Sequence, residues 1–409
     1  MKVLMVNKFL HPNGGSETYI FKLGEQLQEM GHEVQYFGME HEGRVVGNRI
    51  ESYTSDKDFH GGGLGKLLYP LQIIYSTEAK RKMRRVLHDF QPDVVHLNNI
   101  NFQLTPSVIY AVRDYEKKSS RRVRIVYTAH DYQWVCPNHM MRIPSTGAIC
   151  FACRGGDYVQ CTKNRCIHNS GVRSLLGTIE AKYYAKRETY GMVDVIVCPS
   201  EFMKKQLDTD PLLADKTVMM HNFIETSAPQ NGAGYDGRDY VLYFGRFSEE
   251  KGTKTLLEAC EALPEIPFVF AGTGPLEDSV NKVPNVENRG FVTGEALREL
   301  ISGARFSVYP SEWYENCPFS VMESQMYGTP VLVSDLGGAP ELVQAGKTGE
   351  LFRGGDVQEL TEHIGTLWND LELCRRYSAN CKNIKFDTIH EYCDKIVRKV
   401  YAVDCEQDR

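Results

Sequence analysis

Residues 309–330 read Tyr-Pro-Ser-Glu-Trp-Tyr-Glu-Asn-Cys-Pro-Phe-Ser-Val-Met-Glu-Ser-Gln-Met-Tyr-Gly-Thr-Pro, and this stretch decides the fold. An apolar run at 304–309 predicts a buried strand that ends where the stretch begins. Pro318 can open a helix, and Gly328 stops that helix before the next apolar run at 331–333. Strand, loop, helix and strand in this order form one unit of a parallel α/β sheet, and ligands bind such sheets beyond the carboxyl ends of the strands.

Two glutamates of this stretch, Glu315 and Glu323, are expected to face that edge of the sheet. Glu315 falls in the loop, and Glu323 falls just inside the helix. A carboxylate near a helix N-terminus is an acceptor suited to sugar hydroxyls, while the free N–H groups and the dipole of the helix suit a phosphate. The combination suggests a nucleotide-sugar site. The structural alternative is that Glu323 caps its own helix and Glu315 is a solvated loop charge.

The alternation of strands and helices continues through all 409 residues, a length that allows two large domains. Between Pro211 and Asp239 the chain turns polar and irregular, and we place the linker there. We therefore predict an α/β protein with two Rossmann-like, doubly wound αβα domains that face each other across a central cleft. Strands are expected at 2–6, 34–37, 94–97, 123–128 and 193–198 in the first half, and at 240–244, 268–271, 286–291, 306–310 and 331–334 in the second.

Composition narrows the class of protein. The chain is 42% hydrophobic and 24% charged, with a formal net charge of −6, which argues against nucleic acid as a partner. No apolar run approaches the ~18–20 residues that cross a bilayer, and the N-terminus reads as a strand rather than a signal peptide, so we expect a cytoplasmic protein. A basic run at 80–85 and a glycine-rich apolar run at 61–75 are either a solvated helix and a loop or a face for an anionic membrane.

Two cations form a second candidate element. Arg246 leaves the strand that ends at Gly245, and Lys251 precedes a helix by two residues. Cations at such a strand end can clamp a diphosphate and neutralise the charge that grows as a sugar–phosphate bond breaks. The alternative is that both cations pair with Glu249 and Glu250 at the surface, where ion pairs contribute little.

The glycine-bearing loops do not match the Gly-x-Gly-x-x-Gly fingerprint of dinucleotide sites. The loop after the first strand offers only Gly14 and Gly15, and Glu277 takes the place of the third glycine in the loop of Gly272 and Gly274. A nicotinamide or flavin cofactor is therefore not expected. Both loops can still let the backbone approach a phosphate or a base closely.

His130 ends a strand of the first domain, where it either orients a sugar hydroxyl or is hydrogen-bonded structure. It belongs to an ordered set of motifs: Gly14-Gly15, His130-Asp131, Gly-Arg-(x)4-Lys-Gly at 245–252, Ala-Gly-Thr-Gly-Pro at 271–275 and Glu-(x)7-Glu at 315–323. This set resembles the family 4 retaining glycosyltransferases of the GT-B fold. The resemblance spans about residues 1–390.

The resemblance implies a role for each matching residue. His130 would contact the donor sugar near its anomeric carbon, and Arg246 and Lys251 would hold the diphosphate. Glu315 would bind the donor sugar and Glu323 the ribose. The other implied donor-binding positions are Gly15, Gly272, Gly274, Phe291, Phe319 and Ser320. Ser320 stands where the family usually has a glycine, which leaves the donor sugar open.

Several further expectations come with the resemblance. The Arg/Lys pair would replace a divalent ion, so no cofactor is expected for catalysis, and the leaving phosphate would help to deprotonate the acceptor in a same-face displacement with retention. Residues 1–222 would form the acceptor-binding domain, with a cysteine-rich insertion at about 132–172, and residues 223–385 the nucleotide-sugar domain. Residues 386–409 would carry a helix that crosses back to the first domain.

The insertion concentrates five of the chain's 12 cysteines. Cys150-x2-Cys153 and Cys161-x4-Cys166 have the spacing of a tetrahedral zinc knuckle, and Cys136 lies just upstream. The segment is polar and poor in core-forming residues, so it needs a staple, and disulfides are disfavoured in the cytosol. Either a structural zinc ion without a catalytic role or free thiols fit this pattern.

The leading hypothesis is a hexosyltransferase of surface polysaccharide or glycolipid biosynthesis. It would move a sugar from a nucleoside-diphosphate sugar, with a UDP-sugar favoured, to a glycan or lipid-linked acceptor at the inner face of the membrane. The alternatives are a nucleotide-sugar 2-epimerase of the same fold and a nonenzymatic nucleotide-sugar binder. Epimerases lack the arrangement of Arg246, Lys251 and the two glutamates, and the presence of all four residues argues against a degenerate site.

Overall fold

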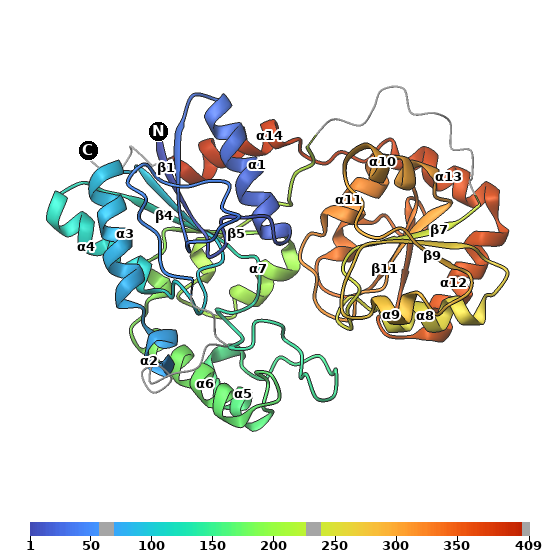
Figure 1. Ribbon diagram of the computed structural model, residues 1–409, viewed down its shortest axis with the longest axis horizontal. Helices are drawn as coiled ribbons and strands as arrows, with labels where there is room; N and C mark the ends of the chain where they lie inside the picture. Colours follow the sequence, from blue (N-terminus) through green and yellow to red (C-terminus); the bar gives the residue numbers. More distant parts are fainter. Residues whose placement is uncertain (57–68, 226–238, 403–409) are drawn as a thin grey trace. The chain divides into compact units, whose positions relative to one another are not determined.

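The computed structural model describes residues 1–56, 69–225 and 239–402, and it divides into two units (Figure 1). One unit comprises Met1–Met220 together with Ile389–Arg409, and the other comprises His221–Thr388. Each unit is built on a parallel six-stranded sheet flanked by helices. The predicted α/β class with two Rossmann-like units is therefore confirmed.

The first unit has the strand order β2-β1-β3-β4-β5-β6. Its strands are β1 (Lys2–Val6), β2 (Glu33–Phe37), β3 (Val94–Leu97), β4 (Arg124–Thr128), β5 (Val195–Cys198) and β6 (Thr217–Met219). Its helices are α1 (Gly15–Glu29), α2 (Tyr69–Ile74), α3 (Thr77–Phe90), α4 (Ser107–Ser119), α5 (Val159–Lys163), α6 (Gly171–Lys186), α7 (Glu201–Leu207) and α14 (Ile389–Ile396). The direction of winding reverses between β1 and β3, so the loops after these two strands diverge there.

The second unit has the strand order β12-β11-β10-β7-β8-β9, with its reversal between β7 and β10. Its strands are β7 (Val241–Phe244), β8 (Phe268–Ala271), β9 (Val286–Asn288), β10 (Phe306–Tyr309), β11 (Val331–Ser334) and β12 (Gly349–Phe352). Its helices are α8 (Thr253–Ala262), α9 (Glu277–Val280), α10 (Gly294–Gly303), α11 (Phe319–Met326), α12 (Val357–Asn369) and α13 (Leu371–Cys381). A ligand site is expected at the reversal.

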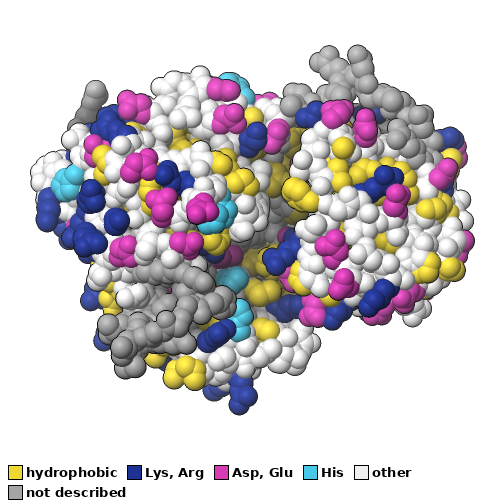
Figure 2. Space-filling model, in the orientation of Figure 1, with side chains coloured by type: hydrophobic (Ala, Val, Ile, Leu, Met, Phe, Trp, Pro, Cys, Tyr) yellow, Lys and Arg dark blue, Asp and Glu magenta, His cyan; other side chains and the backbone are white. Residues whose placement is uncertain are grey.

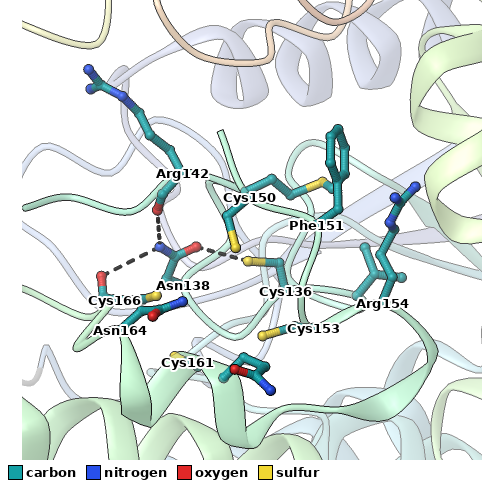
Figure 3. Close-up of a pocket in the computed structure, with 13 residues that line it drawn as sticks. Cys136, Asn138, Arg142, Cys150, Phe151, Cys153, Arg154, Cys161, Asn164 and Cys166 are labelled. Carbon is teal, nitrogen blue, oxygen red and sulfur yellow. Dashed lines mark hydrogen bonds between the residues drawn. The ribbon is translucent and has the colours of Figure 1, made fainter. Parts of the chain in front are cut away.

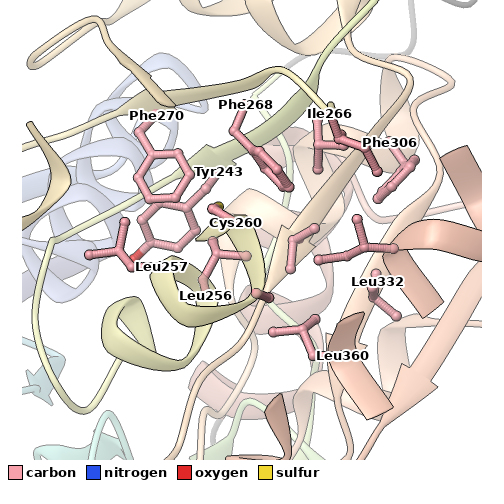
Figure 4. Packing of buried hydrophobic residues seen from close by; sticks show 14 of the residues in the cluster. Tyr243, Leu256, Leu257, Cys260, Ile266, Phe268, Phe270, Phe306, Leu332 and Leu360 are labelled. Carbon is pink, nitrogen blue, oxygen red and sulfur yellow. The ribbon is translucent and has the colours of Figure 1, made fainter. Parts of the chain in front are cut away.

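Both sheets are buried on their two faces, which explains why their central strands are almost continuously apolar. In the second unit, the aromatic rings of Tyr243, Phe268 and Phe270 on β7 and β8 pack with Leu256 and Cys260 of α8 (Figure 4). This core fixes the carboxyl ends of β7 and β10, and the loops that follow them carry most of the expected site residues.

The C-terminal segment packs on the first unit, where α14 contacts α1. Buried hydroxyls join the segment to α1 and to the sheet: Tyr392 and Tyr19 of α1 share a hydrogen bond of 2.8 Å, and Tyr401 lies 2.7 Å from Nδ1 of His96 on β3. The other ring nitrogen of His96 is 2.8 Å from the Thr128 hydroxyl. Burial, with the nearby His130 as a smaller cause, lowers the pKa of His96 to about 3, so this network is neutral at physiological pH.

Three sequence predictions differ from the structure in detail. The strand expected at 286–291 ends at Asn288, because Gly290 has a left-handed φ of +65° that breaks the extended backbone. The expected linker begins too early, since β6 lies inside it, and residues 226–238 lie outside the described residues. The short edge strands β6 and β12 were not predicted, because neither is a continuous apolar run.

The basic run forms the middle of α3, and Lys and Arg side chains gather on the surface over α3 and α4 (Figure 2). Part of this charge is compensated, because Lys80 and Arg84 both pair with Asp114 of α4, the lysine at 2.8 Å. Arg81 and Arg85 are exposed. Most of the glycine-rich run at 61–75 lies outside the described residues. Among the helices that the structure describes, none is long and apolar enough to cross a membrane.

Candidate functional site

The loops that follow β7 and β10 enclose a small pocket at the reversal of the second sheet. Gly252 allows the two loops to approach each other. Its φ is +70°, and a Cβ at this position would lie 1.8 Å from the carbonyl oxygen of Pro310. The pocket lining includes Gly245, Arg246 and Lys251 from the first loop, and Ser311, Glu315 and Ser320 from the second loop and the start of α11.

The Glu315 carboxylate is held in this pocket by three donors. Its Oε1 accepts hydrogen bonds from Lys251 Nζ at 2.5 Å, Ser311 Oγ at 2.8 Å and Trp313 Nε1 at 2.8 Å. The side chain is only 12% exposed. Burial by itself would raise the pKa of Glu315, but the Lys251 charge and the hydrogen bonds outweigh burial and lower this pKa. Glu315 is therefore a buried anion, and the alternative of a solvated loop charge is wrong.

The second oxygen of Glu315 is available for a ligand. All three hydrogen bonds go to Oε1, and among the described residues none goes to Oε2. The loop backbone is fixed as well, because the Gly338 N–H donates to the Glu315 carbonyl at 2.6 Å. Gly337 has a φ of +70°, and a Cβ there would lie 2.3 Å from the same carbonyl oxygen. The loop after β11 thus holds Glu315 in place, and only glycine fits at position 337.

Arg246 is exposed, and within the described part of the chain its guanidinium forms no ion pair. The acids next to it are engaged elsewhere. Glu249 pairs with Lys254, and Glu250 accepts a hydrogen bond from Ser248 Oγ at 2.6 Å. Since Lys251 pairs with Glu315, the alternative in which Glu249 and Glu250 neutralise the two cations is wrong.

Glu323 is the fifth residue of α11 and does not cap that helix. The N-cap residue is Pro318, and no side chain caps the terminus. Burial, with the charge of Glu225 as a smaller cause, raises the pKa of Glu323 to about 7. Nothing in the described ranges hydrogen-bonds to its carboxylate. A partly buried acceptor without a donor is suited to a ligand that brings hydroxyl groups.

Gly272 and Gly274 lie against the loop that carries Arg246. A Cβ on Gly272 would lie 1.9 Å from the carbonyl oxygen of Gly245, and one on Gly274 would lie 2.4 Å from that of Phe247. The Phe247 N–H also donates to the Thr273 carbonyl at 2.9 Å. The close backbone approach that we expected at this loop is therefore present, but it is made to the backbone of the Arg246 loop. These glycines set the position of the Arg246 loop.

The remaining expected donor-site residues of this unit lie at its loop ends. Ser320 lines the pocket, and its carbonyl accepts a hydrogen bond from the Tyr309 hydroxyl at 2.8 Å. Phe319 meets the ring of Phe223 edge-on, with centroids 5.8 Å apart. Phe291, beyond the end of β9, is 79% exposed. An aromatic ring so exposed at the carboxyl edge of a parallel sheet is placed to contact a ligand.

His130 and Gly15 belong to the first unit. His130 follows β4, and its Nε2 lies 2.9 Å from Oδ1 of Asn98, while its ring lies edge-on to Tyr19 at 5.1 Å between centroids. Burial lowers the pKa of His130 to about 3, so the ring is neutral. Gly15 is exposed and begins α1, whose N-terminus has no side-chain cap.

Sequence reasoning missed several residues that support the site. Ser311 and Trp313 lie within the quoted stretch, yet nothing in their spacing marks them as partners of Glu315. Gly337 and Gly338 lie in the next loop, where the Gly-Gly pair was the one available signal. Asn98 follows β3 and meets His130 only because β3 and β4 are neighbours in the sheet.

The five cysteines of the insertion line one small cavity (Figure 3). They come from a loop after β4, from a turn at 150–153 and from the neighbourhood of α5. In the part of the chain that the structure describes, no three His, Cys, Asp or Glu side chains are already arranged to hold a metal ion. Cys150, Cys153, Cys161 and Cys166, for which the sequence left a structural zinc ion and free thiols open, lie around this cavity together with Cys136.

Two family models match the chain. The model for glycosyltransferase family 4 matches residues 13–228, which is more than half of the chain, and the model for glycosyl transferases group 1 matches residues 225–384. The chain is a glycosyltransferase of family 4, with the GT-B fold that its two parallel sheets define.

Two relatives and one solved structure are similar to the chain, the solved structure in its fold. A protein of Klebsiella pneumoniae described as an uncharacterized 42.6 kDa protein in the cps region is 23% identical over 84% of this chain and 87% of that protein. The uncharacterized glycosyltransferase MJ1178 of Methanocaldococcus jannaschii is 27% identical over 58% of this chain, and the alignment spans 66% of that relative. The structure of Anabaena Alr3699/HepE in complex with UDP matches with a TM-score of 0.65 at 17% identity, covering 97% of this chain and 100% of that chain.

Proposed function

We propose that this chain is a retaining, metal-independent hexosyltransferase that takes a sugar from a nucleoside-diphosphate sugar. The acceptor is a glycan or a lipid-linked saccharide of surface polysaccharide or glycolipid biosynthesis. The observation that carries the proposal is the Glu315 carboxylate, held by three donors through one oxygen and placed in one pocket with Arg246 and Lys251.

The two cations bind the diphosphate in this proposal. The Arg246 guanidinium is exposed and can bind phosphate oxygens bidentately, while Lys251 uses one of its three donors on Glu315 and keeps two for phosphate. Their charges stabilise the negative charge that grows on the leaving diphosphate. A divalent ion performs that task in other transferases, so chelators should leave the rate unchanged.

The carboxylates bind the sugar parts of the donor. Oε2 of Glu315 accepts from donor-sugar hydroxyls, because Oε1 is already saturated. Glu323 accepts from the ribose hydroxyls, which are the donors that its carboxylate lacks. We favour uracil as the base because Alr3699/HepE, which has the same fold, binds UDP. Phe291 offers an exposed ring for stacking on a base.

His130 acts as a neutral hydrogen-bonding group in this mechanism. Its Nε2 is engaged with Asn98 Oδ1, which fixes the orientation of the ring, and its low pKa keeps the ring in the neutral form at neutral pH. We place it and Gly15 near the reacting carbon of the donor sugar. The acceptor is deprotonated by the leaving phosphate, and the new bond forms on the same face of the sugar.

Association with an anionic membrane is the second part of the proposal. Arg81 and Arg85 of α3 are exposed, whereas Lys80 and Arg84 are paired with Asp114. The double variant R81E/R85E should release the protein from vesicles that contain about 30% anionic lipid, while K80A should have a smaller effect. Unchanged binding of the double variant would remove this part of the proposal.

Donor hydrolysis tests the core of the proposal. The protein is incubated with UDP-, GDP- and ADP-sugars, with and without EDTA, and products are identified by mass spectrometry and by NMR of the released sugar. Slow release of one nucleoside diphosphate, insensitive to EDTA and lost in Glu315→Ala, with initial retention at the anomeric carbon, is expected. Formation of an epimer of the donor would show an epimerase. Donor binding by calorimetry without turnover, even with oligosaccharide acceptors, would show a nonenzymatic binder.

A further inference from the structure

Helix α6 is amphipathic in the reverse sense. The side that it packs against the first unit is small or polar, and its buried residues are Ser174, Gly177, Thr178, Glu180 and Tyr184. The outward side carries Val172, Leu175 and Ile179, which are 73%, 49% and 45% exposed. A helix on the surface of a protein normally turns its apolar side chains inward, so the outward side of α6 is suited to an apolar environment.

We call Val172, Leu175 and Ile179 the α6 stripe. They lie on one face, because residues three and four positions apart are neighbours on the surface of a helix. Among the side chains that the structure describes, no other helix exposes a large apolar one. The helix is also attached to its surroundings, since the Tyr184 hydroxyl donates a hydrogen bond to the Ile74 carbonyl of α2. The α6 stripe is therefore a fixed part of the surface.

The charges around the α6 stripe are of one sign. Within residues 171–187 the exposed charged residues are Arg173, Lys182, Lys186 and Arg187, and they form no ion pair with any described residue. The single acid of this range, Glu180, is buried, and burial raises its pKa to about 8, so its carboxyl is protonated at neutral pH. Long basic side chains beside an apolar stripe can reach anionic headgroups while the stripe enters an apolar layer.

Tyrosine rings and cations connect α6 with the basic run of α3 along one side of the first unit (Figure 1). The Arg187 guanidinium lies 5.0 Å from the ring centroid of Tyr183 and 6.0 Å from that of Tyr110 on α4. Nζ of Lys80 on α3 lies 5.5 Å from the centroid of Tyr110 and 5.9 Å from that of Tyr75. All three tyrosines are half-buried, and tyrosines are enriched where proteins meet lipid headgroups.

We propose that α6 lies in the interface of an anionic membrane, with the α6 stripe at the boundary between headgroups and acyl chains. The four cations of 171–187 bind lipid phosphates. A lipid surface matches both parts of this face, because acyl chains take up the apolar side chains and phosphates neutralise the basic ones. The inference rests on the membrane part of the proposed function and names the element that enters the lipid. It does not depend on sugar transfer.

The depth of α6 in the lipid tests the proposal directly. Ile179→Trp is mixed with vesicles of phosphatidylcholine and about 30% anionic phosphatidylglycerol, and its fluorescence is compared with and without bromine atoms on the acyl chains. Bromine should quench the added tryptophan about twofold. Val45→Trp is the matched control, since Val45 is an exposed apolar residue of the first unit outside α6, and its quenching should equal that of the unaltered protein. Equal quenching in both variants overturns the proposal.

A charge variant tests the contribution of the α6 stripe to binding. L175E/I179E should weaken vesicle binding at least about tenfold, because two apolar side chains no longer enter the lipid. V45E should bind like the unaltered protein. Both changes lie at exposed positions, and thermal unfolding checks that the fold is retained.

The remaining outcomes separate this inference from the proposed function. Full binding of L175E/I179E, together with loss of binding in R81E/R85E, would overturn the role of α6 and leave the membrane part of the proposed function in place. Failure of the unaltered protein to bind vesicles would overturn both, whereas donor hydrolysis would still test the transferase. A change from dimer to monomer in L175E/I179E, measured by light scattering, with vesicle binding unchanged, would show that the α6 stripe joins two copies of the chain and would overturn the proposal.

Discussion

The loops at the carboxyl ends of the two parallel sheets differ in their chemistry. In the second unit, a buried carboxylate is paired with a lysine at 2.5 Å and an arginine stands nearby without an ion pair among the described residues. In the first unit, His130 follows β4, one strand away from the reversal between β1 and β3; its ring meets Asn98 and Tyr19, and burial keeps both His96 and His130 neutral. A parallel sheet thus provides the place for a ligand, and the loop residues decide whether that ligand is charged.

The difference fits the proposed division of labour. A nucleotide diphosphate requires fixed positive charge, whereas a sugar hydroxyl in a transfer reaction requires neutral hydrogen-bonding groups.

The largest effect is expected at Glu315. Glu315→Ala removes the anchored acceptor and frees Lys251, so kcat/KM should fall by about 10³-fold, in line with the loss of a preorganised group. Kinetics with the donor identified above measure this. The double variant with Lys251→Ala should be scarcely worse than either single change, because the pair acts as a unit. Fully additive losses would contradict that coupling.

Arg246 should show the second largest effect. Arg246→Ala is expected to lower kcat/KM by about 10²-fold, and Arg246→Lys should restore little of it, because a lysine cannot bind two phosphate oxygens in a planar fork. Lys254→Ala is the control, since this neighbouring exposed cation pairs with Glu249. Equal losses in Arg246→Ala and Lys254→Ala would indicate a general effect of surface charge.

The buried His96 of the first unit should make the stability of the protein sensitive to acid. The folded pKa of His96 is about 3 and its ordinary value is 6.5, so the unfolded chain binds the extra proton between these values. Stability from this group is complete above pH 6.5 and is lost as the pH falls toward 3, with about 2 kcal/mol gone at pH 5. The free energy of unfolding, measured with urea, should therefore fall by less between pH 8 and pH 5 in His96→Gln than in the unaltered protein. The same difference in both proteins would contradict a neutral His96.

The smallest effect concerns Glu323, whose raised pKa of about 7 predicts a pH-dependent KM for the donor. Only the ionised carboxylate accepts from both ribose hydroxyls, so donor KM should rise about tenfold from pH 8 to pH 6. Glu323→Gln should remove this dependence, while Glu258→Gln, an exposed change on α8, should retain it. A pH-independent KM in the unaltered protein would contradict the ribose role.

Sequence periodicity predicted most of the two sheets because both are buried on two faces. Strands such as β7 and β10 are continuous apolar runs, and this signal does not require knowledge of their neighbours. The edge strands β6 and β12 have fewer apolar residues in a row. They become strands because they pair with β5 and β11, and their own sequences do not indicate this pairing. The apolar run predicted a strand that continues to residue 291, but the left-handed backbone at Gly290 ends it earlier.

The amino-acid sequence by itself determined the alternating α/β pattern, the order of the motifs and the chemical types available at each loop. Only the tertiary structure decided which of them meet. Lys251 and Glu315 are 64 positions apart, and they touch because β7 and β10 are neighbours in the sheet. Cys136 joins the later cysteines for a similar reason, since the loop after β4 returns to them. Periodicity records local burial, whereas partner choice depends on strand order, which no short stretch of sequence contains.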